Sequence, residues 1–326
     1  MIYDDVVYWR VEIDDPIALE IITSPRMQRL KWVDQAWYLE PYFPWAWHSR
    51  FEHSVWVYLL LKRYWAPIEE QIAWLLHDIS HWAFSHCLDY VFDEWNQKEQ
   101  THQDNIFEEF LKDTDIPWIL EKYWLNLEHI LDDDRHPLKE NNLPDICADR
   151  IDYSLRDAID YDKLSKEKIN NILDGLKVLD NNRVFDNFES AKQYFDLFFR
   201  MNEIYWSGIE TALMFTTVWH ILRYSWKKWY IERNDFYTTD REVIDKMTKY
   251  LSVDDELKIL RDRMNNKIPF EIDETNYDGN VFCKSRVVDP FFMIEWKKNR
   301  VSDVNESSKN LILNNKAKEY FIRFEK

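Results

Sequence analysis

The chain has 326 residues, 46% of them hydrophobic, which is ample for a buried core and allows about two domains. A formal net charge of −18 at pH 7 argues against a general nucleic-acid surface and an anionic-membrane surface, because both need a basic footprint. The three cysteines form no C-x-x-C pair, no secretory signal is visible at M-I-Y-D-D, and the apolar run at 55–61 is far too short to span a bilayer. We therefore expect a cytoplasmic protein with reduced cysteines.

Two helices are predicted in the first quarter of the chain. Residues 49–64 carry apolar side chains at helical spacing, and Arg50 and His53 share one face of that helix. Residues 68–79 predict a second helix that is almost wholly apolar until its end. The first helix therefore places a fixed cation beside an imidazole.

His77 and Asp78 stand at the end of the apolar second helix. Two adjacent polar side chains in such a place need partners, because an unpaired buried carboxylate is costly. Imidazole nitrogens and carboxylate oxygens are ligands that a borderline divalent cation accepts, so a metal ion is the natural partner. His81 follows His77 by four residues and is close enough to lie over the same site.

A further helix is predicted around residues 149–157. Its polar residues fall on a single face, and its apolar residues fall on the other. Such a face is usually solvated, but here it can line a polar cleft and offer Asp149 to the metal. The polar residues of this face are Asp149, Asp152, Tyr153, Arg156 and Asp157.

The second half of the chain predicts mostly helices. Residues 191–205 and 209–224 are strongly amphipathic and indicate a core or a dimer interface. After them we expect two short helices, at 240–251 and 254–265, a stretch with β character at 280–296, and a polar tail. We divide the chain into an all-α domain, residues 1–231, and a C-terminal accessory region, residues 232–326, whose role the sequence leaves open; its position suggests oligomerisation or a lid.

Several motifs resemble those of the HD-domain metal-dependent phosphohydrolases, whose ligands run His, His-Asp and Asp along the chain. The resemblance is to the deoxynucleoside triphosphate triphosphohydrolase branch, which is dGTPase-like, and it covers about the first half of the chain. It rests on Q-R-L at 28–30, D-Q at 34–35, H-S-R-F-E-H-S at 48–54, L-L-H-D-I-S-H-W-A-F-S-H at 75–86, Asp89, T-H-Q at 101–103 and D-R-I-D-Y-S-L-R-D at 149–157.

The resemblance implies a mainly α fold, an HD-domain helical bundle with a small C-terminal region containing some β. It implies one divalent metal ion, Fe, Mn, Zn, Ni or Mg, held by His53, His77, Asp78 and Asp149. The catalytic acid/base and leaving-group residues would be His81, Asp89 and His102. Substrate would be bound by Arg50 and Arg150 at the phosphates and by Gln35, Tyr153 and Asp157 at the sugar. The reaction would convert a deoxynucleoside triphosphate into a deoxynucleoside and triphosphate, in a homo-oligomer.

Three kinds of alternative remain: another phosphohydrolase, two disfavoured branches of the resembled family, and a regulator without turnover. A different phosphohydrolase on the same scaffold, such as a 5′-nucleotidase or phosphodiesterase, would use the same ligands. An alarmone hydrolase is disfavoured because Ile79 and Ser80 follow the His-Asp pair, and a cyclic-dinucleotide phosphodiesterase is disfavoured because no G-Y-P follows. A nucleotide-binding regulator without turnover is the third, although all four expected ligands are present.

The composition is unusual in holding 3 glycines and 17 tryptophans. Average usage of about 7% would give roughly twenty glycines. Tryptophans stand where turns and helix ends favour glycine, as at Trp45, Trp65 and Trp124, and in the resembled family Trp37, Trp45, Trp56 and Trp82 occupy glycine positions. We hypothesise that the gene uses UGA for glycine, so that many of these tryptophans are glycines in the organism; the rival is a truly Trp-rich protein. UGG codons at Trp45, Trp47 and Trp56 would contradict the hypothesis, and indoles at Trp37, Trp45 and Trp82 would overfill the site.

Overall fold

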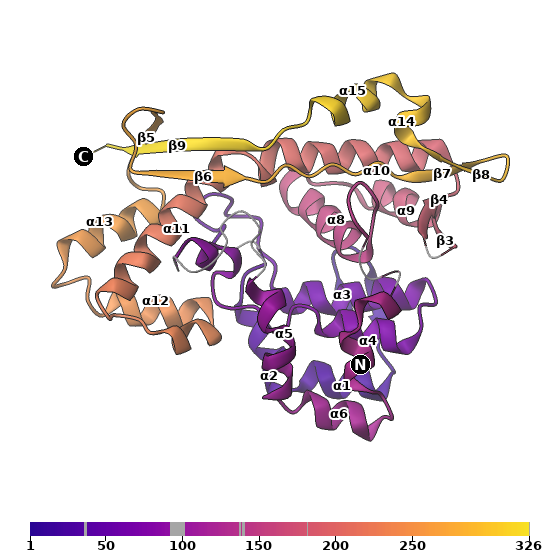
Figure 1. Cartoon of the computed structure of the whole chain (residues 1–326), viewed down its shortest axis with the longest axis horizontal. Coiled ribbons are helices and arrows are strands. Elements are labelled where there is room, and N and C mark those ends of the chain that lie inside the picture. Colours follow the sequence, from indigo (N-terminus) through magenta and orange to yellow (C-terminus); the bar gives the residue numbers. More distant parts are fainter. Residues whose placement is uncertain (36–37, 92–101, 137, 139–140, 181, 326) are drawn as a thin grey trace.

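The computed structural model describes residues 1–35, 38–91, 102–136, 138, 141–180 and 182–325. Within these residues the fold is mainly helical with three small sheets, which confirms the predicted fold class (Figure 1). In Figure 1 the helices α1 to α4 (residues 16–76) lie in the part of the molecule that holds the N-terminus, and α8 (Ala148–Asp162) packs against both α3 (Arg50–Arg63) and α10 (Phe188–Met201).

Short helices and two longer ones build the first half of the chain. Ser49 caps the helix that begins at Arg50, as its side chain accepts a hydrogen bond from the Glu52 amide and Glu52 accepts one from the Ser49 amide. The elements are α1 (Pro16–Thr23), α2 (Pro25–Arg29), η1 (Leu30–Trp32), α3 (Arg50–Arg63), α4 (Ile68–Leu76), η2 (Ser85–Tyr90), α5 (His102–Lys112), α6 (Ile116–Lys122), α7 (Leu127–Leu131), η3 (Asp133–Arg135) and α8 (Ala148–Asp162).

The predicted helices of the second half are present, and further ones follow them. The predicted amphipathic stretches correspond to α10 and α11, and the predicted short helices to α12 and α13. The elements are α9 (Lys166–Gly175), α10 (Phe188–Met201), the π-helical η4 (Asn202–Trp206), α11 (Ile209–Lys227), η5 (Arg233–Tyr237), α12 (Asp240–Thr248), α13 (Asp255–Met264), α14 (Val301–Val304) and α15 (Glu306–Asn314).

Three sheets join strands that are distant in sequence. An antiparallel hairpin pairs β1 (Ile2–Asp5) with β2 (Trp9–Glu12). The second sheet has the order β3 (Leu176–Leu179), β4 (Asn182–Phe185), β7 (Phe291–Ile294) and β8 (Lys297–Arg300), and its β4 and β7 are parallel. The third sheet places β9 (Lys318–Phe324) between β5 (Phe270–Ile272) and β6 (Gly279–Cys283). The predicted polar tail contains a strand that was not predicted, because its last residues form the central strand of this sheet.

Two hydrophobic clusters form the core. The first joins α1, α3, α4 and α8 with α9 and α10, and includes Phe292 of β7. The second gathers Leu39, Phe84, most of α11 and the buried sides of α12, α13, β6 and β9. The second sheet and both clusters thus contain residues from both predicted domains, 1–231 and 232–326. The domain boundary at residue 231 stays a prediction.

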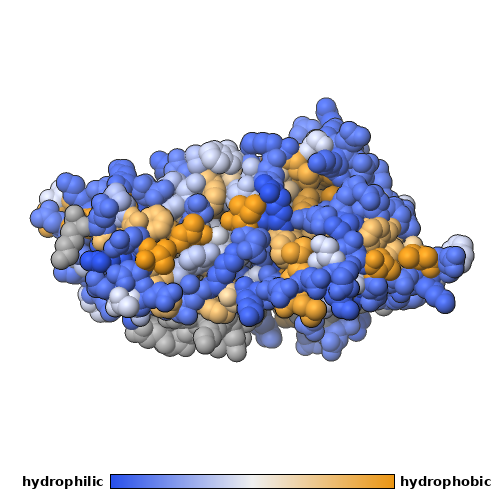
Figure 2. Space-filling model, turned by 90° about the horizontal axis from the view of Figure 1, so that it is seen from above, coloured by the Kyte–Doolittle hydropathy of each residue, from blue (hydrophilic) through white to orange (hydrophobic). Residues whose placement is uncertain are grey.

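The surface agrees with the strongly acidic composition. The face seen from above Figure 1 is mostly hydrophilic and is interrupted by separate apolar patches (Figure 2). Exposed apolar side chains on the C-terminal elements include Leu313 in α15 and Ile294 at the end of β7. Among the helices that the structure describes, none is both long and apolar enough to cross a membrane.

Five tryptophans adopt the left-handed backbone conformation that favours glycine. Their φ angles lie between 59° and 68°, at Trp9, Trp65, Trp124, Trp229 and Trp296. None of the three glycines, all of which the structure describes, has a positive φ. A left-handed conformation costs a residue with a Cβ atom roughly 1–2 kcal/mol. This distribution supports the glycine hypothesis at Trp65 and Trp124; Trp37 lies outside the described residues.

Replacing exposed left-handed tryptophans with glycine should stabilise the fold. Trp65, Trp124, Trp229 and Trp296 are 92%, 94%, 77% and 96% exposed, so little packing is lost with the indole. We expect each Trp→Gly variant to raise the free energy of unfolding by about 1 kcal/mol, measured by denaturant titration.

Trp118 is the matched control for these variants. It is 63% exposed but lies in α6, where the backbone is helical. Trp118→Gly should lower the free energy of unfolding by up to about 1 kcal/mol, because glycine disfavours a helix. Destabilisation of similar size in all five variants would contradict the argument.

Candidate metal centre

Three helices bring the centre together. The capping box of α3 fixes the start of that helix, so His53 lies one turn inside it, and its side chain is fully buried. Helix α4 ends at Leu76, which places His77 at its C-cap. Asp149 lies in the first turn of α8, and α8 and α4 both pack against α3.

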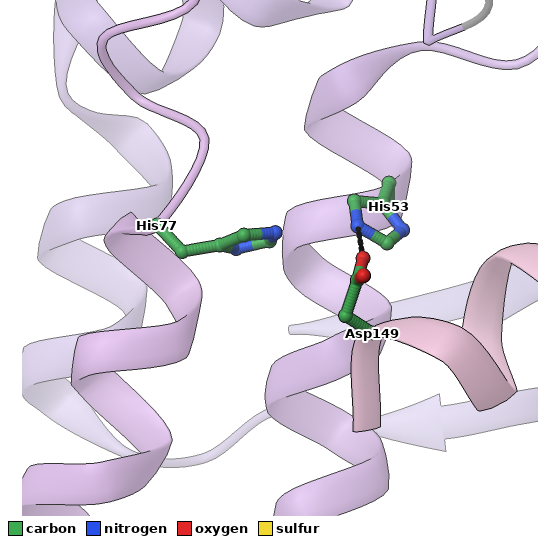
Figure 3. A group of neighbouring side chains, drawn as sticks. All are labelled: His53, His77 and Asp149. Atoms are coloured by element: carbon green, nitrogen blue, oxygen red, sulfur yellow. Dashed lines mark ion pairs between the residues drawn. The ribbon is translucent and has the colours of Figure 1, made fainter. Parts of the chain in front are cut away.

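His53, His77 and Asp149 point toward one another from these helices (Figure 3). One ligand atom from each residue lies within 4.8 Å of the other two. Nε2 of His53 is 3.0 Å from Oδ1 of Asp149, yet the buried nitrogen makes no well-directed hydrogen bond among the described residues. Two imidazole nitrogens and one carboxylate oxygen that lie this close together fit a divalent cation.

The second nitrogen of each imidazole is held from outside the centre. Nδ1 of His53 lies 2.8 Å from Oδ2 of Asp152, and Nδ1 of His77 lies 2.6 Å from the Trp74 carbonyl oxygen. Each Nδ1–H donates to these acceptors, which leaves Nε2 of both rings for the centre. Such outer contacts orient metal-binding histidines and increase their basicity.

A buried ion-pair chain continues from Asp152. Arg156 donates from Nη2 to Asp152 Oδ1 at 3.1 Å and from Nη1 to Asp5 Oδ2 at 2.8 Å. Burial raises the pKa of Asp152, but Arg156 and His53 outweigh burial and hold the pKa below its usual value. Asp152 therefore stays ionised and accepts from His53. The sequence analysis placed Asp152 and Arg156 on the polar face of α8 without a role, and it did not identify Asp5.

Asp78 lies beside the three-residue centre. Its Oδ1 is 3.5 Å from His77 Nε2 and 3.1 Å from His81 Nε2, and its Oδ2 accepts from Arg50 Nη1 at 2.7 Å. Burial raises the pKa of Asp78, but Arg50, His77 and His81 outweigh burial and lower the pKa well below its usual value. One carboxylate thus connects the centre to a predicted phosphate ligand and a predicted acid/base residue, while its role as fourth metal ligand stays a prediction.

The predicted sugar-side residues carry polar atoms in need of partners. The buried Oε1 of Gln35 and the buried hydroxyl of Tyr153 have no hydrogen-bond partner within the described residues. Asp157 accepts from Trp206 Nε1 at 2.6 Å, and burial raises the pKa of Asp157 to about 6. His48, to which the sequence analysis gave no role, is buried with Nε2 3.8 Å from Asp157.

The remaining predicted residues lie differently. Arg150 donates to the carbonyl oxygens of Asn141 and Asp145, so its guanidinium faces the loop before α8. His102 begins α5 and Asp89 lies in η2, but the side chains of both lie outside the described part of the structure. The roles predicted for these three residues stay predictions.

Metal uptake should release a proton at neutral pH. Burial lowers the pKa of His53, but its contacts with Asp149 and Asp152 outweigh burial and raise the pKa to about 10. The ring is therefore protonated in the metal-free protein, and Nε2 must lose its proton to bind a cation. We expect Mn²⁺ or Zn²⁺ affinity to rise about tenfold per pH unit between pH 6 and 8, measured by calorimetry in buffers of different ionisation enthalpy. Affinity independent of pH would contradict this assignment.

Asp152→Asn should weaken metal binding although Asp152 belongs to the outer contacts. An asparagine cannot balance the charge of Arg156 or stabilise His53 as the carboxylate does, so we expect roughly 10–100-fold weaker metal binding in equilibrium dialysis. Asp289→Asn is the control, since Asp289 is also buried but accepts from Ser302 in the C-terminal region. An equal loss in both variants would point to general destabilisation.

Comparison with known proteins agrees with this geometry. The HD domain model matches residues 50–157, which span α3 to α8. Uncharacterized protein YdhJ of Bacillus subtilis is 33% identical over 312 residues, covering 94% of this chain and 93% of that protein. A crystallised phosphohydrolase from Bacteroides thetaiotaomicron has the same fold, with a TM-score of 0.74, 16% identity and full coverage of both chains.

Two relatives with named activities are similar over shorter stretches. The metal-dependent phosphohydrolase cns2 of Cordyceps militaris is 32% identical over 189 residues, covering 58% of this chain and 52% of that protein. The deoxynucleoside triphosphate triphosphohydrolase SAMHD1 of Gallus gallus is 31% identical over 147 residues, covering 39% of this chain and 24% of that protein. The chain therefore spans about half of the first and a quarter of the second. The chain belongs to the HD-domain family and is a metal-dependent phosphohydrolase of the HD type.

Proposed function

We propose that this phosphohydrolase converts deoxynucleoside triphosphates into deoxynucleosides and triphosphate by cleaving the bond between the 5′ oxygen and the α-phosphorus. The observation that carries the proposal is the placement of unpartnered polar groups beside the metal centre, on the side formed by α8 and the segment before α3. The similarity to a deoxynucleoside triphosphate triphosphohydrolase over 39% of this chain supports the same substrate class.

The residues of the centre have separate tasks in this reaction. A divalent cation held by His53, His77 and Asp149 supplies Lewis-acid chemistry toward a phosphoryl oxygen and activates water at neutral pH. Arg50 donates three of its five N–H groups to the protein, so two remain for a phosphate. His81 is 3.1 Å from Asp78, which holds its imidazole ready to move a proton.

Arg50 suits the phosphate contact better than Arg150 does. The guanidinium of Arg50 lies on Asp78, next to the centre, whereas that of Arg150 faces carbonyl oxygens of the loop before α8. A guanidinium beside the scissile phosphate offers paired N–H donors and neutralises the phosphate charge.

The proposed sugar-binding side is inferred from buried polar atoms that lack hydrogen-bond partners among the described residues. A buried polar atom without a partner costs free energy, and a substrate hydroxyl would remove that cost at Gln35 Oε1 or at the Tyr153 hydroxyl. Asp157 and His48 add a carboxylate and an imidazole within the same region. A site of this kind distinguishes substrates by their hydroxyl groups, because a substrate lacking one would leave the protein group unpaired.

A second candidate is hydrolysis of another phosphate ester. The relative cns2, named only as a metal-dependent phosphohydrolase, is similar over 58% of this chain, against 39% for SAMHD1 of Gallus gallus. The same cation and the same Arg50 would serve a nucleoside monophosphate or a phosphodiester. Product identity separates the two candidates, because only the first releases intact triphosphate.

The decisive assay offers metal-loaded protein a panel of nucleotides and identifies the phosphate product. The full chain is loaded in turn with Mn²⁺, Fe²⁺, Ni²⁺, Zn²⁺ and Mg²⁺ and given each deoxynucleotide and ribonucleotide, singly and in mixtures. Phosphorus NMR or ion chromatography then distinguishes triphosphate from single phosphate. We expect triphosphate from at least one deoxynucleoside triphosphate.

Two variants show that the centre is responsible. Asp149→Asn should lower turnover at least 100-fold, because the centre loses an anionic ligand. His129→Gln alters a histidine that is 42% exposed and ion-paired with Glu69, so it should leave turnover unchanged. Single phosphate as the product, or no triphosphate from any deoxynucleotide, contradicts the proposed substrate class.

A further inference from the structure

Asp240, the first residue of α12, ties three distant segments of the chain together. Its Oδ2 accepts from the Asp34 amide at 2.8 Å, and its Oδ1 accepts from the Phe84 amide at 2.7 Å. Both acceptor atoms of the carboxylate are therefore engaged by backbone N–H groups from the first part of the chain. The C-terminal region, which has no assigned role, thus reaches the neighbourhood of the metal centre.

The two segments held by Asp240 are the ones that hold Arg50. The carbonyl oxygen of Gln35, next to Asp34, accepts from Arg50 Nη2 at 3.1 Å. The side chain of Ser85, next to Phe84, accepts from Arg50 Nε at 3.1 Å. Two of the three fixed contacts of the buried guanidinium therefore come from residues adjacent to those that Asp240 binds.

The segment at Phe84 and Ser85 needs this support. Both residues have positive φ angles, 60° and 42°, in a conformation that costs residues with a Cβ atom roughly 1–2 kcal/mol each. Such conformations persist only where the surroundings impose them. Besides Asp240, the carbonyl oxygen of Phe236 accepts from the Ala83 amide at 2.8 Å, so residues of η5 and α12 together fix this turn.

Arg29 strengthens the same junction. Its Nη1 donates to the Thr238 carbonyl at 2.9 Å, and its Nη2 donates to the carbonyls of Ile79 at 3.0 Å and His81 at 2.6 Å. The backbone that carries His81 is thereby linked to the residue two positions before Asp240. The junction extends along the whole segment that follows the His77-Asp78 pair.

We propose that Asp240 is a positioning residue for the phosphohydrolase reaction. By accepting hydrogen bonds from the backbone at Asp34 and Phe84, Asp240 holds the Arg50 guanidinium against Asp78. The inference rests on the proposed role of Arg50 at the substrate phosphate, but it is independent of the base and sugar of the substrate. It gives the C-terminal region a direct function in building the site.

The test variant is Asp240→Asn. An asparagine side chain has one oxygen acceptor, and its NH₂ group would face the second backbone N–H, so one of the two contacts is lost. We expect kcat/KM to fall roughly 10–100-fold, because a small displacement of a substrate-positioning group has effects of this size. Affinity for Mn²⁺ should stay within threefold, since no metal ligand is touched.

Asp235→Asn is the matched control. Asp235 is buried in the same region and accepts from Lys246 and the Glu232 amide, but it does not contact the segments at Asp34 or Phe84. Its activity should stay within about twofold of the parent. An equal loss of activity in both variants would overturn the proposal.

A double-mutant cycle with Arg50→Lys gives a readout that a purely structural role would not change. Lysine keeps the charge beside Asp78 but loses the forked donors to Gln35 and Ser85. If Asp240 acts through Arg50, Asp240→Asn should have less than a twofold further effect in the Arg50→Lys protein. Additive effects would overturn the proposal.

The cycle is run with p-nitrophenyl phosphate and bis(p-nitrophenyl) phosphate as well as with nucleotides, so that a wrong substrate class does not affect the test. Hydrogen–deuterium exchange supplies the readout that needs no turnover. In Asp240→Asn, the amides of Asp34 and Phe84 should exchange at least tenfold faster, and in Asp235→Asn they should not. Unchanged exchange at both amides would overturn the proposal even if no phosphate ester is hydrolysed.

Discussion

The arrangement of the centre depends on one imidazole held between two carboxylates. His53 is fully buried, with Asp149 on its Nε2 side and Asp152 on its Nδ1 side. The buried Asp152 and the partly exposed Asp149 are tolerable this close together only because cationic groups accompany them, and Arg156 supplies the permanent charge on the outer side. On the inner side the cation is a proton on His53 or a metal ion. Charge as well as packing therefore joins the helices α3 and α8. A metal ion would replace the proton on His53 at a position where the fold already gathers negative charge.

The ligands of this centre could be predicted because local sequence carries them. His53 lies one turn after a capping box, His77 ends an apolar helix, and Asp149 begins an amphipathic one, so each is marked by the pattern of its own element. Asp5 could not be predicted in this way. It comes from a short strand, it is separated from Arg156 by 151 residues, and nothing in its neighbourhood indicates a buried ion pair. Asp240 escaped prediction for the same reason, since its partners are backbone amides without a sequence signature.

The strands show which part of the fold local sequence could not predict. Residues 318–324 look polar on average, yet Tyr320, Ile322 and Phe324 recur at every second position, as one face of a half-buried strand requires. That signal was available, and the expectation of a polar tail gave it too little weight. The pairing of β4 with β7 was not available, because it joins Val184 to Phe291 and no local pattern specifies so distant a partner. Local periodicity therefore predicts elements, while the layers that surround the centre depend on long-range pairing.

The tryptophans bear on the centre less than their number suggests. Trp74 holds His77 through its carbonyl oxygen, a contact that glycine would make equally well. Trp56 is fully buried against Tyr3 and Tyr8, and Arg156 lies 5.4 Å from its ring, so its side chain fills space above the ion-pair chain. Trp206 donates a side-chain hydrogen bond to Asp157, a residue predicted to bind substrate. With glycine at that position, the Asp157 carboxylate would lose its indole donor. The metal centre is thus set by the backbone of three helices, and the indoles of Trp56 and Trp206 affect chiefly the surroundings of Arg156 and Asp157.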